Sequence, residues 1–132
     1  MNSSGRQLEG EFVVSHFRRR LVFNGAEQSF ASGKATLMEE FGGCTSAPGT
    51  PSGYHEWKAY GVQRRQFMAS EEDLADYLRE VLPELVRVGA AGAMLWCFAD
   101  YAPELYHRPP CDESVHERTF GLVRPDGSLK PH

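Results

Sequence analysis

The feature that most constrains the fold is an amphipathic helix followed at once by a short apolar segment. Ser70 is a good helix N-cap, and the acidic run 71–73 suits the positive end of the helix dipole. Apolar residues then recur at steps of three and four until Gly89, where the helix should stop. Pro83 should kink or split it. The predicted buried face consists of Leu74, Tyr77, Leu78, Val81, Leu82, Leu85 and Val86.

The apolar segment 90–98 predicts a strand buried on both faces, as in a parallel sheet. Upstream, residues 11–17 and 35–41 have the composition of strands, and residues 26–32 predict one or two helical turns. Because strands alternate with helical segments, the expected fold class is α/β, with parallel strands joined by helical crossovers. A small open α/β sandwich is the alternative.

Two long loops separate these elements. Residues 42–53 are rich in Gly, Pro, Ser and Thr, and residues 101–117 carry three prolines. Loops of this length in a compact domain are often functional. Residues 120–123 predict a last short strand, and the Pro-Asp-Gly that begins at Pro125 predicts a turn.

Length and composition limit the alternatives. The 132 residues suit one domain, with a polar linker at 1–10 and a folded domain at 11–132. A whole (β/α)8 barrel takes about 250 residues, so a barrel of this length can only be partial. Net charge is −4 with two short basic runs, so we expect no nucleic-acid partner.

The three cysteines lack a C-x-x-C spacing, which predicts neither a disulfide framework nor a zinc site. Residues 1–10 do not resemble a signal peptide. No apolar run approaches the roughly 20 residues that span a membrane, so we expect a soluble protein with no membrane partner. The cytoplasm and secretion with a leader outside this sequence both remain open.

In folds with parallel strands, chemistry gathers at the carboxyl ends of the strands. This rule brings His16, Glu39, Glu40, Trp96 and Asp100 to one rim. Strand side chains alternate, so only one of the two glutamates can face the centre of the rim. A carboxylate, a histidine and an aromatic plane for stacking on a sugar ring together suit a carbohydrate site.

Four short segments carry a family resemblance. They are VSHF at 14–17, LMEEFG at 37–42, GAMLWCF at 92–98 and FGLVRPDGSLKP at 120–131. They resemble, in order, the sixth, seventh and eighth strands and the closing segment of clan A (β/α)8 glycoside hydrolases, closest to the family 5 cellulases and mannanases. The resemblance covers the chain from about residue 11 onward and implies three C-terminal β/α units of such a barrel.

The resemblance implies retaining hydrolysis of a β-linked polysaccharide or oligosaccharide, with β-1,4-linked glucan or mannan as the substrate class. Glu40 stands directly before an aromatic residue and a glycine, which is the position of the family nucleophile. Trp96 stands where the family has the tryptophan that floors the subsite of the attacked sugar. This chemistry requires no metal and no organic cofactor.

Further residues are predicted to contact substrate. His16 and Asp100 lie on the predicted rim, and Tyr54 and Trp57 follow the first long loop. Packing against the helix is an equal alternative for this tyrosine and tryptophan. His16 could also be an ordinary hydrogen-bonded histidine at a strand end.

The sequence departs from the family pattern at the second carboxylate. The family acid/base is a glutamate after an asparagine on the fourth strand, and this chain contains no Asn-Glu pair. The tyrosine of the family's His-x-Tyr pattern is Arg18 here. The loop carboxylates that are candidates to replace the acid are Asp100, Glu104, Asp112 and Glu113.

Three strands leave open sheet edges, which predicts self-association into a homo-oligomer. Three hypotheses follow: an active hydrolase completed by assembly, a non-catalytic fragment of a hydrolase, and a carbohydrate-binding module that uses the Trp96 ring.

Overall fold

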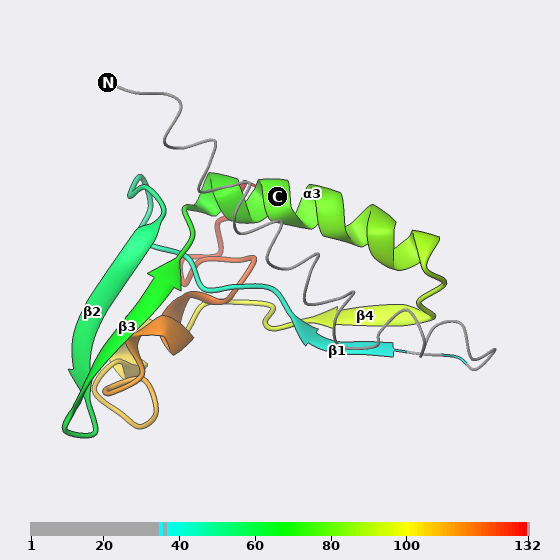
Figure 1. Ribbon diagram of the computed structural model, residues 1–132. Coiled ribbons are helices and arrows are strands. Elements are labelled where there is room, and N and C mark those ends of the chain that lie inside the picture. Colours follow the sequence, from blue (N-terminus) through cyan, green and yellow to red (C-terminus); the bar gives the residue numbers. More distant parts are fainter. Residues whose placement is uncertain (1–34, 36, 132) are drawn as a thin grey trace.

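The computed structural model describes residue 35 and residues 37–131. The predicted linker 1–10, strand 11–17 with His16, and helical turns 26–32 lie outside the described residues. The described elements, shown in Figure 1, are strand β1 (Leu37–Phe41), strand β2 (Gly53–Ala59), strand β3 (Val62–Met68), helix α3 (Glu71–Arg87), strand β4 (Gly92–Leu95), and the 3-10 helices η1 (Pro103–Leu105) and η2 (Val115–Thr119).

β1 and β4 pair in parallel, as the sequence predicts, although they are far apart along the chain. Leu37 lies opposite Gly92, and Phe41 lies opposite Leu95, with an irregularity in register between. A Cβ at Gly92 would lie 2.7 Å from the end of the Leu37 side chain, so a larger residue there would require this exposed side chain to move. α3 covers one side of the pair (Figure 1).

The prediction that segment 90–98 is buried on both faces is wrong for this structure. Strand β4 is shorter than that segment, and the side chains of Met94 and Phe98 are exposed. Only Leu95 of β4 packs against the core under α3. An apolar run predicts that both faces of the strand are covered. Among the described residues, α3 covers only one face of β4.

The antiparallel hairpin β2–β3 was not predicted. Ala59 pairs with Val62, which leaves Tyr60 and Gly61 as a two-residue turn with φ of 51° and 77°. Positive φ at both positions is the signature of a type I′ turn, which matches the twist of the two strands. The usual sequence signal is Asn-Gly or Asp-Gly, and Tyr-Gly lacks it.

α3 begins and ends as predicted. The Ser70 hydroxyl accepts a hydrogen bond from the Asp73 backbone N–H at 3.0 Å. Gly89 has a φ of 81°, and its N–H donates to the Val86 carbonyl, while the Ala90 N–H donates to that of Leu85. This pair of bonds is a Schellman motif, which satisfies carbonyls that the helix leaves open at its end.

The predicted splitting of α3 at Pro83 is wrong, since the helix is continuous through it. Proline has no backbone N–H, so the Arg79 carbonyl one turn earlier receives no helical hydrogen bond from Pro83. Both residues are exposed, and water can bond to this carbonyl instead. The buried face is also narrower than predicted, because Leu82 is 46% and Val86 78% exposed. The core residues are Phe41, Ala69, Leu74, Tyr77, Leu78, Val81 and Leu85.

The segment that follows β4 folds back along the loop after β1. The predicted strand 120–123 is wrong: Val123 makes only isolated bridges, to Ala99 and to Leu129. The turn at 125–127 is confirmed, with the Gly127 N–H donating to the Arg124 carbonyl at 2.9 Å. Arg124 in turn makes a bidentate ion pair with Glu71 in the first turn of α3, so the C-terminal end lies beside this helix (Figure 1).

The three cysteines are free thiols, and Cys44 and Cys111 are buried. In the part of the chain that the structure describes, no helix combines the length and apolar character needed to cross a membrane.

Candidate functional site

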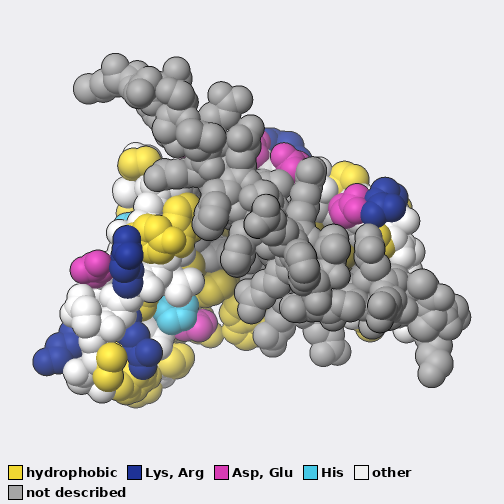
Figure 2. Space-filling view, in the orientation of Figure 1, with side chains coloured by type: hydrophobic (Ala, Val, Ile, Leu, Met, Phe, Trp, Pro, Cys, Tyr) yellow, Lys and Arg dark blue, Asp and Glu magenta, His cyan; other side chains and the backbone are white. Residues whose placement is uncertain are grey.

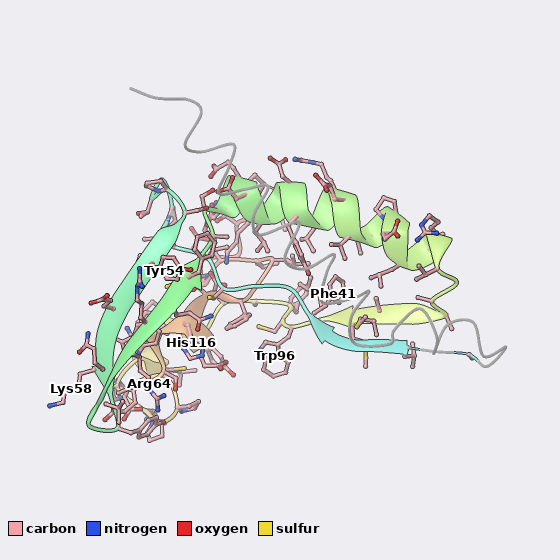
Figure 3. All side chains as sticks on the ribbon, in the orientation of Figure 1. Phe41, Tyr54, Lys58, Arg64, Trp96 and His116 are labelled. Atoms are coloured by element: carbon pink, nitrogen blue, oxygen red, sulfur yellow. The ribbon has the colours of Figure 1, made fainter. Side chains whose placement is uncertain are left out.

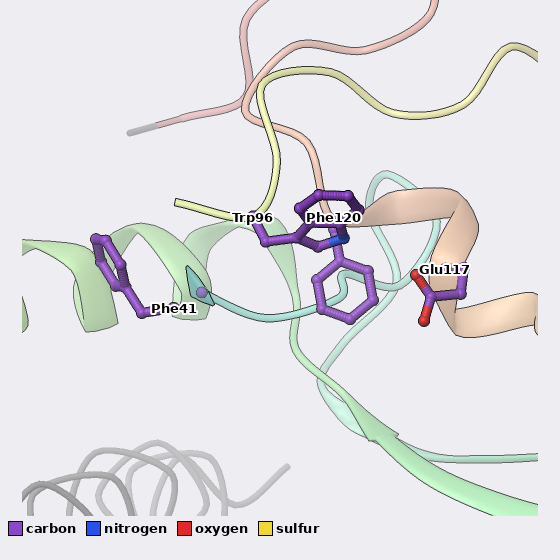
Figure 4. A pocket seen from close by; sticks show the side chains of 5 residues that line it. Phe41, Trp96, Glu117 and Phe120 are labelled. Carbon is purple, nitrogen blue, oxygen red and sulfur yellow. The ribbon is translucent and has the colours of Figure 1, made fainter. Parts of the chain in front are cut away.

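A pocket of about 380 Å³ opens at the carboxyl ends of β1 and β4 (Figure 4). Its lining comes from the end of β1, the end of β4 and the η2 region, and consists of Phe41, Gly42, Trp96, Glu117 and Phe120. This is the edge at which the strand order predicts a functional rim. The rings of Trp96 and Phe120 lie near one carboxylate, whereas the Phe41 ring points into the core beneath α3 (Figure 4).

Trp96 is fixed in the pocket through its backbone. Its N–H donates to the Phe41 carbonyl at 2.9 Å, and the next N–H, of Cys97, donates to the Phe120 carbonyl at 3.1 Å. The side chain remains 42% exposed, and its ring points away from α3 (Figure 3). A ring that is anchored at its backbone and open on one face can stack against a ligand.

Gly42 allows the chain to pass close to Trp96. Its φ is 124°, in the region that favours glycine, and a Cβ there would lie 3.1 Å from the Trp96 carbonyl oxygen. The glycine of the Glu-Phe-Gly segment therefore has a local steric role at this edge of the pocket.

Glu117 is the lining residue that sequence reasoning missed. It is partly buried, and its Oε1 atom lies 3.4 Å from Nε2 of His116. The centroid of the His116 ring lies 5.5 Å from that of Trp57 and 6.2 Å from that of Phe120. The buried Nδ1 atom of His116 has no hydrogen-bond partner among the described residues. Nothing in the local sequence distinguishes Glu117 from the other acidic residues that precede it, because only the chain path brings it to the pocket.

A buried polar network lies next to the pocket. The Lys130 ammonium, on a residue only 3% exposed, donates to Oδ1 of Asp100 at 2.8 Å, to Oγ1 of Thr45 at 2.9 Å and to the Thr119 carbonyl at 3.3 Å. The same Asp100 oxygen accepts from the Gly121 N–H at 2.7 Å. A paired and fully hydrogen-bonded buried charge of this kind fixes the position of every group that it touches.

This network holds the η2 wall against the loop after β1. The Thr45 N–H donates to the Thr119 carbonyl at 3.0 Å, and the Thr119 hydroxyl donates back to the Thr45 carbonyl at 2.7 Å. Phe120 follows Thr119 directly and Glu117 precedes it by two residues in η2, so the bonds to Thr45 also restrain the backbone at both lining residues. The pocket wall therefore has a rigid support.

The predicted substrate contact of Asp100 does not fit this arrangement. Its side chain is 7% exposed, and its Oδ1 already accepts from Lys130 and Gly121. The sequence places Asp100 just past the third strand and so on the rim. The structure instead turns its carboxylate toward the C-terminal segment, where it neutralises a lysine 30 positions away.

Tyr54 and Trp57 both lie on β2, outside the pocket lining. Tyr54 is exposed on β2 (Figure 3). Its ring is edge-on to Phe67, and the Arg65 guanidinium lies 4.1 Å from the ring centroid. The Trp57 indole N–H donates to the Glu113 carbonyl at 2.8 Å. The alternative prediction was packing against the helix. Neither residue belongs to the apolar cluster under α3, and both lie on strand β2 of the hairpin.

Glu40 lies in β1 directly before Phe41, and its side chain lies outside the described part of the structure, as does that of Glu39. Of the loop carboxylates considered as replacement acids, none lines the pocket. Glu113 caps the hairpin turn by accepting from the Tyr60 N–H at 2.6 Å, and Asp112 accepts from the Glu113 N–H at 2.9 Å.

The thiols near this site are held in the neutral form. Burial raises the pKa of Cys44 from 9.0 to about 11, and burial also raises the pKa of Cys97, whose Sγ donates to the Ala99 carbonyl. A raised pKa lowers the thiolate fraction and therefore the nucleophilicity of both. Among the described residues, no group of three or more His, Cys, Asp or Glu side chains is arranged to hold a metal ion.

Charged side chains on the visible face are mixed in sign. Figure 2 shows Lys and Arg side chains over the hairpin and alternating acidic and basic side chains along α3. The helix carries exposed ion pairs of the i,i+3 type, Asp76 with Arg79 and Glu84 with Arg87. Such pairs serve a solvated helix surface.

The chain matches no protein-family model and no curated protein. The resemblance to clan A glycoside hydrolases therefore remains a prediction that depends on the four segments named above.

Proposed function

We propose that this chain is part of a retaining glycoside hydrolase that acts on β-linked polysaccharide or oligosaccharide, with Glu40 as the nucleophile. The observation that carries the proposal is the aromatic pocket at the carboxyl ends of two parallel strands, with the Trp96 ring open to it and β1, the strand of Glu40, beside it. An apolar concave site with few polar groups is the usual form of a ligand site.

The chemistry follows from the carboxylate. The Glu40 oxygen attacks the anomeric carbon, the glycosidic C–O bond breaks, and a second acid protonates the departing oxygen. Water then attacks the same carbon, the ester bond to Glu40 breaks, and the second group takes the proton from water. The rings of Trp96 and Phe120 suit the C–H face of a sugar and exclude water from one side, while the Phe41 ring packs in the core beneath α3.

The acid/base and the remaining strands are proposed to come from another surface, in a partial (β/α)8 barrel that is completed by self-association. Support comes from the sheet pair, where Leu37 of β1 and Met94 of β4 both have large apolar side chains that are exposed. Exposed apolar side chains on two paired strands suit a contact surface. Light scattering tests the assembly: a mass equal to one chain would contradict it.

A second candidate is a carbohydrate-binding module without turnover. The Trp96 pocket favours it, because an exposed indole ring beside a carboxylate would bind a sugar whether or not a second acid completes the site. Turnover separates the two candidates.

The test is hydrolysis of aryl β-glycosides and of β-1,4-linked gluco- and manno-oligosaccharides by the parent and by Glu40→Gln. We expect kcat to fall on the order of 10³-fold or more, because an amide cannot act as the nucleophile. Glu39→Gln is the matched control, as its neighbour on β1 should face the other way and leave kcat near the parental value.

Rapid-quench mass spectrometry adds a direct readout. A glycosyl adduct on the peptide that contains Glu40 supports the nucleophile. Turnover by the parent that survives in Glu40→Gln and is lost in Glu39→Gln would overturn the assignment. Glycan binding without turnover by the parent supports the binding module.

A further inference from the structure

Glu117 is the acidic group in the pocket lining, and its surroundings suit a sugar. The other four lining residues are Phe41, Gly42, Trp96 and Phe120, so the carboxylate is the only charged group among the residues that form the wall. In the view of Figure 4 the Phe120 ring lies between Glu117 and the Trp96 ring. Its one ion-pair partner among the described residues is His116, at 3.4 Å.

The backbone of Glu117 is held in place before any ligand arrives. It belongs to η2, whose last residue, Thr119, is bonded to Thr45 and to the buried Lys130. The neighbouring ring of His116 is packed between Trp57 and Phe120. A group that is already ordered loses little conformational freedom when it binds, so its hydrogen bonds contribute more fully to affinity.

We propose that Glu117 is a substrate-binding residue that accepts hydrogen bonds from two adjacent hydroxyl groups of the sugar ring stacked on Trp96. An ionised carboxylate is acceptor-only and has two oxygens, which matches a pair of neighbouring hydroxyl donors. The apolar face of the same ring would lie on the indole. The ligand class is therefore a neutral β-linked glycan with two free vicinal hydroxyls at this subsite.

The charge of Glu117 also sets a specificity. A uronic acid at this subsite would bring a second carboxylate into a largely apolar pocket, where like charges repel strongly. Neutral hexose units are accepted and acidic ones are rejected. The inference rests on the proposed function for the nature of the ligand, and it does not depend on Glu40 being the nucleophile.

The test measures glycan binding by calorimetry, apart from turnover. The probes are a β-1,4-linked gluco- or manno-oligosaccharide and its analogues that lack one ring hydroxyl. Charged hydrogen bonds are strong, so Glu117→Gln should weaken Kd for the hydroxylated glycan about 10- to 100-fold. For the analogue that lacks the contacted hydroxyl, parent and variant should differ far less.

Two variants control for structure. Glu104→Gln changes an exposed carboxylate in η1 of the same loop and should leave Kd unchanged. Glu117→Asp keeps the charge on a shorter side chain and should retain rejection of uronic acids, which Glu117→Gln should lose. A merely structural role would weaken the binding of all glycans equally and would not alter this discrimination.

The outcomes separate this inference from the proposed hydrolysis. Selective loss of affinity in Glu117→Gln supports the inference even if the parent shows no turnover. Parental Kd in Glu117→Gln, an equal loss for all analogues, or no glycan binding by the parent overturns it, whatever the Glu40 variants show.

Discussion

Two regions of this molecule are stabilised in opposite ways. The sheet-and-helix region, made of β1, β4 and α3, is held by apolar packing around Leu74, Leu78 and Val81. The loop region, made of residues 42–46 and 97–131, is held by the buried Lys130–Asp100 pair and the bonds around it. The pocket lies where the two regions meet.

Apolar packing and polar hydrogen bonds determine different features of this structure. Apolar packing determines that the sheet and helix come together, but it leaves the outer apolar side chains Leu82 and Val86 exposed. Directional polar bonds determine where η2 lies and hence which side chains enter the pocket. The first region has apolar surface left to cover, whereas the Lys130 and Asp100 side chains of the second are paired inside.

The largest expected stability effect comes from breaking the polar region. Asp100→Asn leaves the buried Lys130 charge without a counter-charge, which should lower the free energy of unfolding by about 3–5 kcal/mol. Urea unfolding measures it. Asp76→Asn, which breaks an exposed pair with Arg79, is the control and should cost under about 0.5 kcal/mol.

The double variant Asp100→Leu with Lys130→Met sharpens this test. Replacing both partners with apolar groups should recover much of the loss, because no buried charge is left unpaired. An equal decrease in the free energy of unfolding for Asp100→Asn and Asp76→Asn would contradict the view that the buried pair stabilises the loop region.

The apolar region should respond to the position of a leucine on α3. Leu78→Ala removes a buried side chain and should cost about 3 kcal/mol, within the range for core leucines. Leu82→Ala, one turn further along the exposed face, should cost less than about 0.5 kcal/mol. Thermal or urea unfolding compares them. Equal losses would mean that the outer face is buried by another surface in solution.

The smallest expected effect lies at Cys44, in the loop region. Its thiol has a pKa of 9.0 when free and about 11 when buried, so the unfolded chain loses this proton first. Stability that is present below pH 9 is therefore lost as the pH rises toward 11, by on the order of 2 kcal/mol. Burial also raises the pKa of Tyr77, which extends the loss above pH 10.

Urea unfolding at pH 8, 9.5 and 11 checks this sign. Cys44→Ala should show a smaller difference in unfolding free energy between pH 8 and 11 than the parent. An unchanged difference would mean that the Cys44 thiol does not carry this pH dependence.

The sequence by itself determined the features that depend on neighbours along the chain. The Ser70 cap, the end of α3 at Gly89 and the inner apolar face each follow from local hydrogen bonding or from helical periodicity. The alternation of strand and helix predicted the parallel pairing of β1 with β4 and an edge carrying Trp96. The family resemblance added Glu40, whose role awaits the turnover test.

Only the tertiary structure decided the rest. The Tyr60–Gly61 turn gives no standard hairpin signal, and Asp100 meets Lys130 across 30 positions. Glu117 enters the pocket because η2 is bonded to the loop after β1, through Thr45 and Thr119, 74 positions apart. Contacts between distant segments depend on the path of the whole chain, and no local pattern of residue types encodes that path.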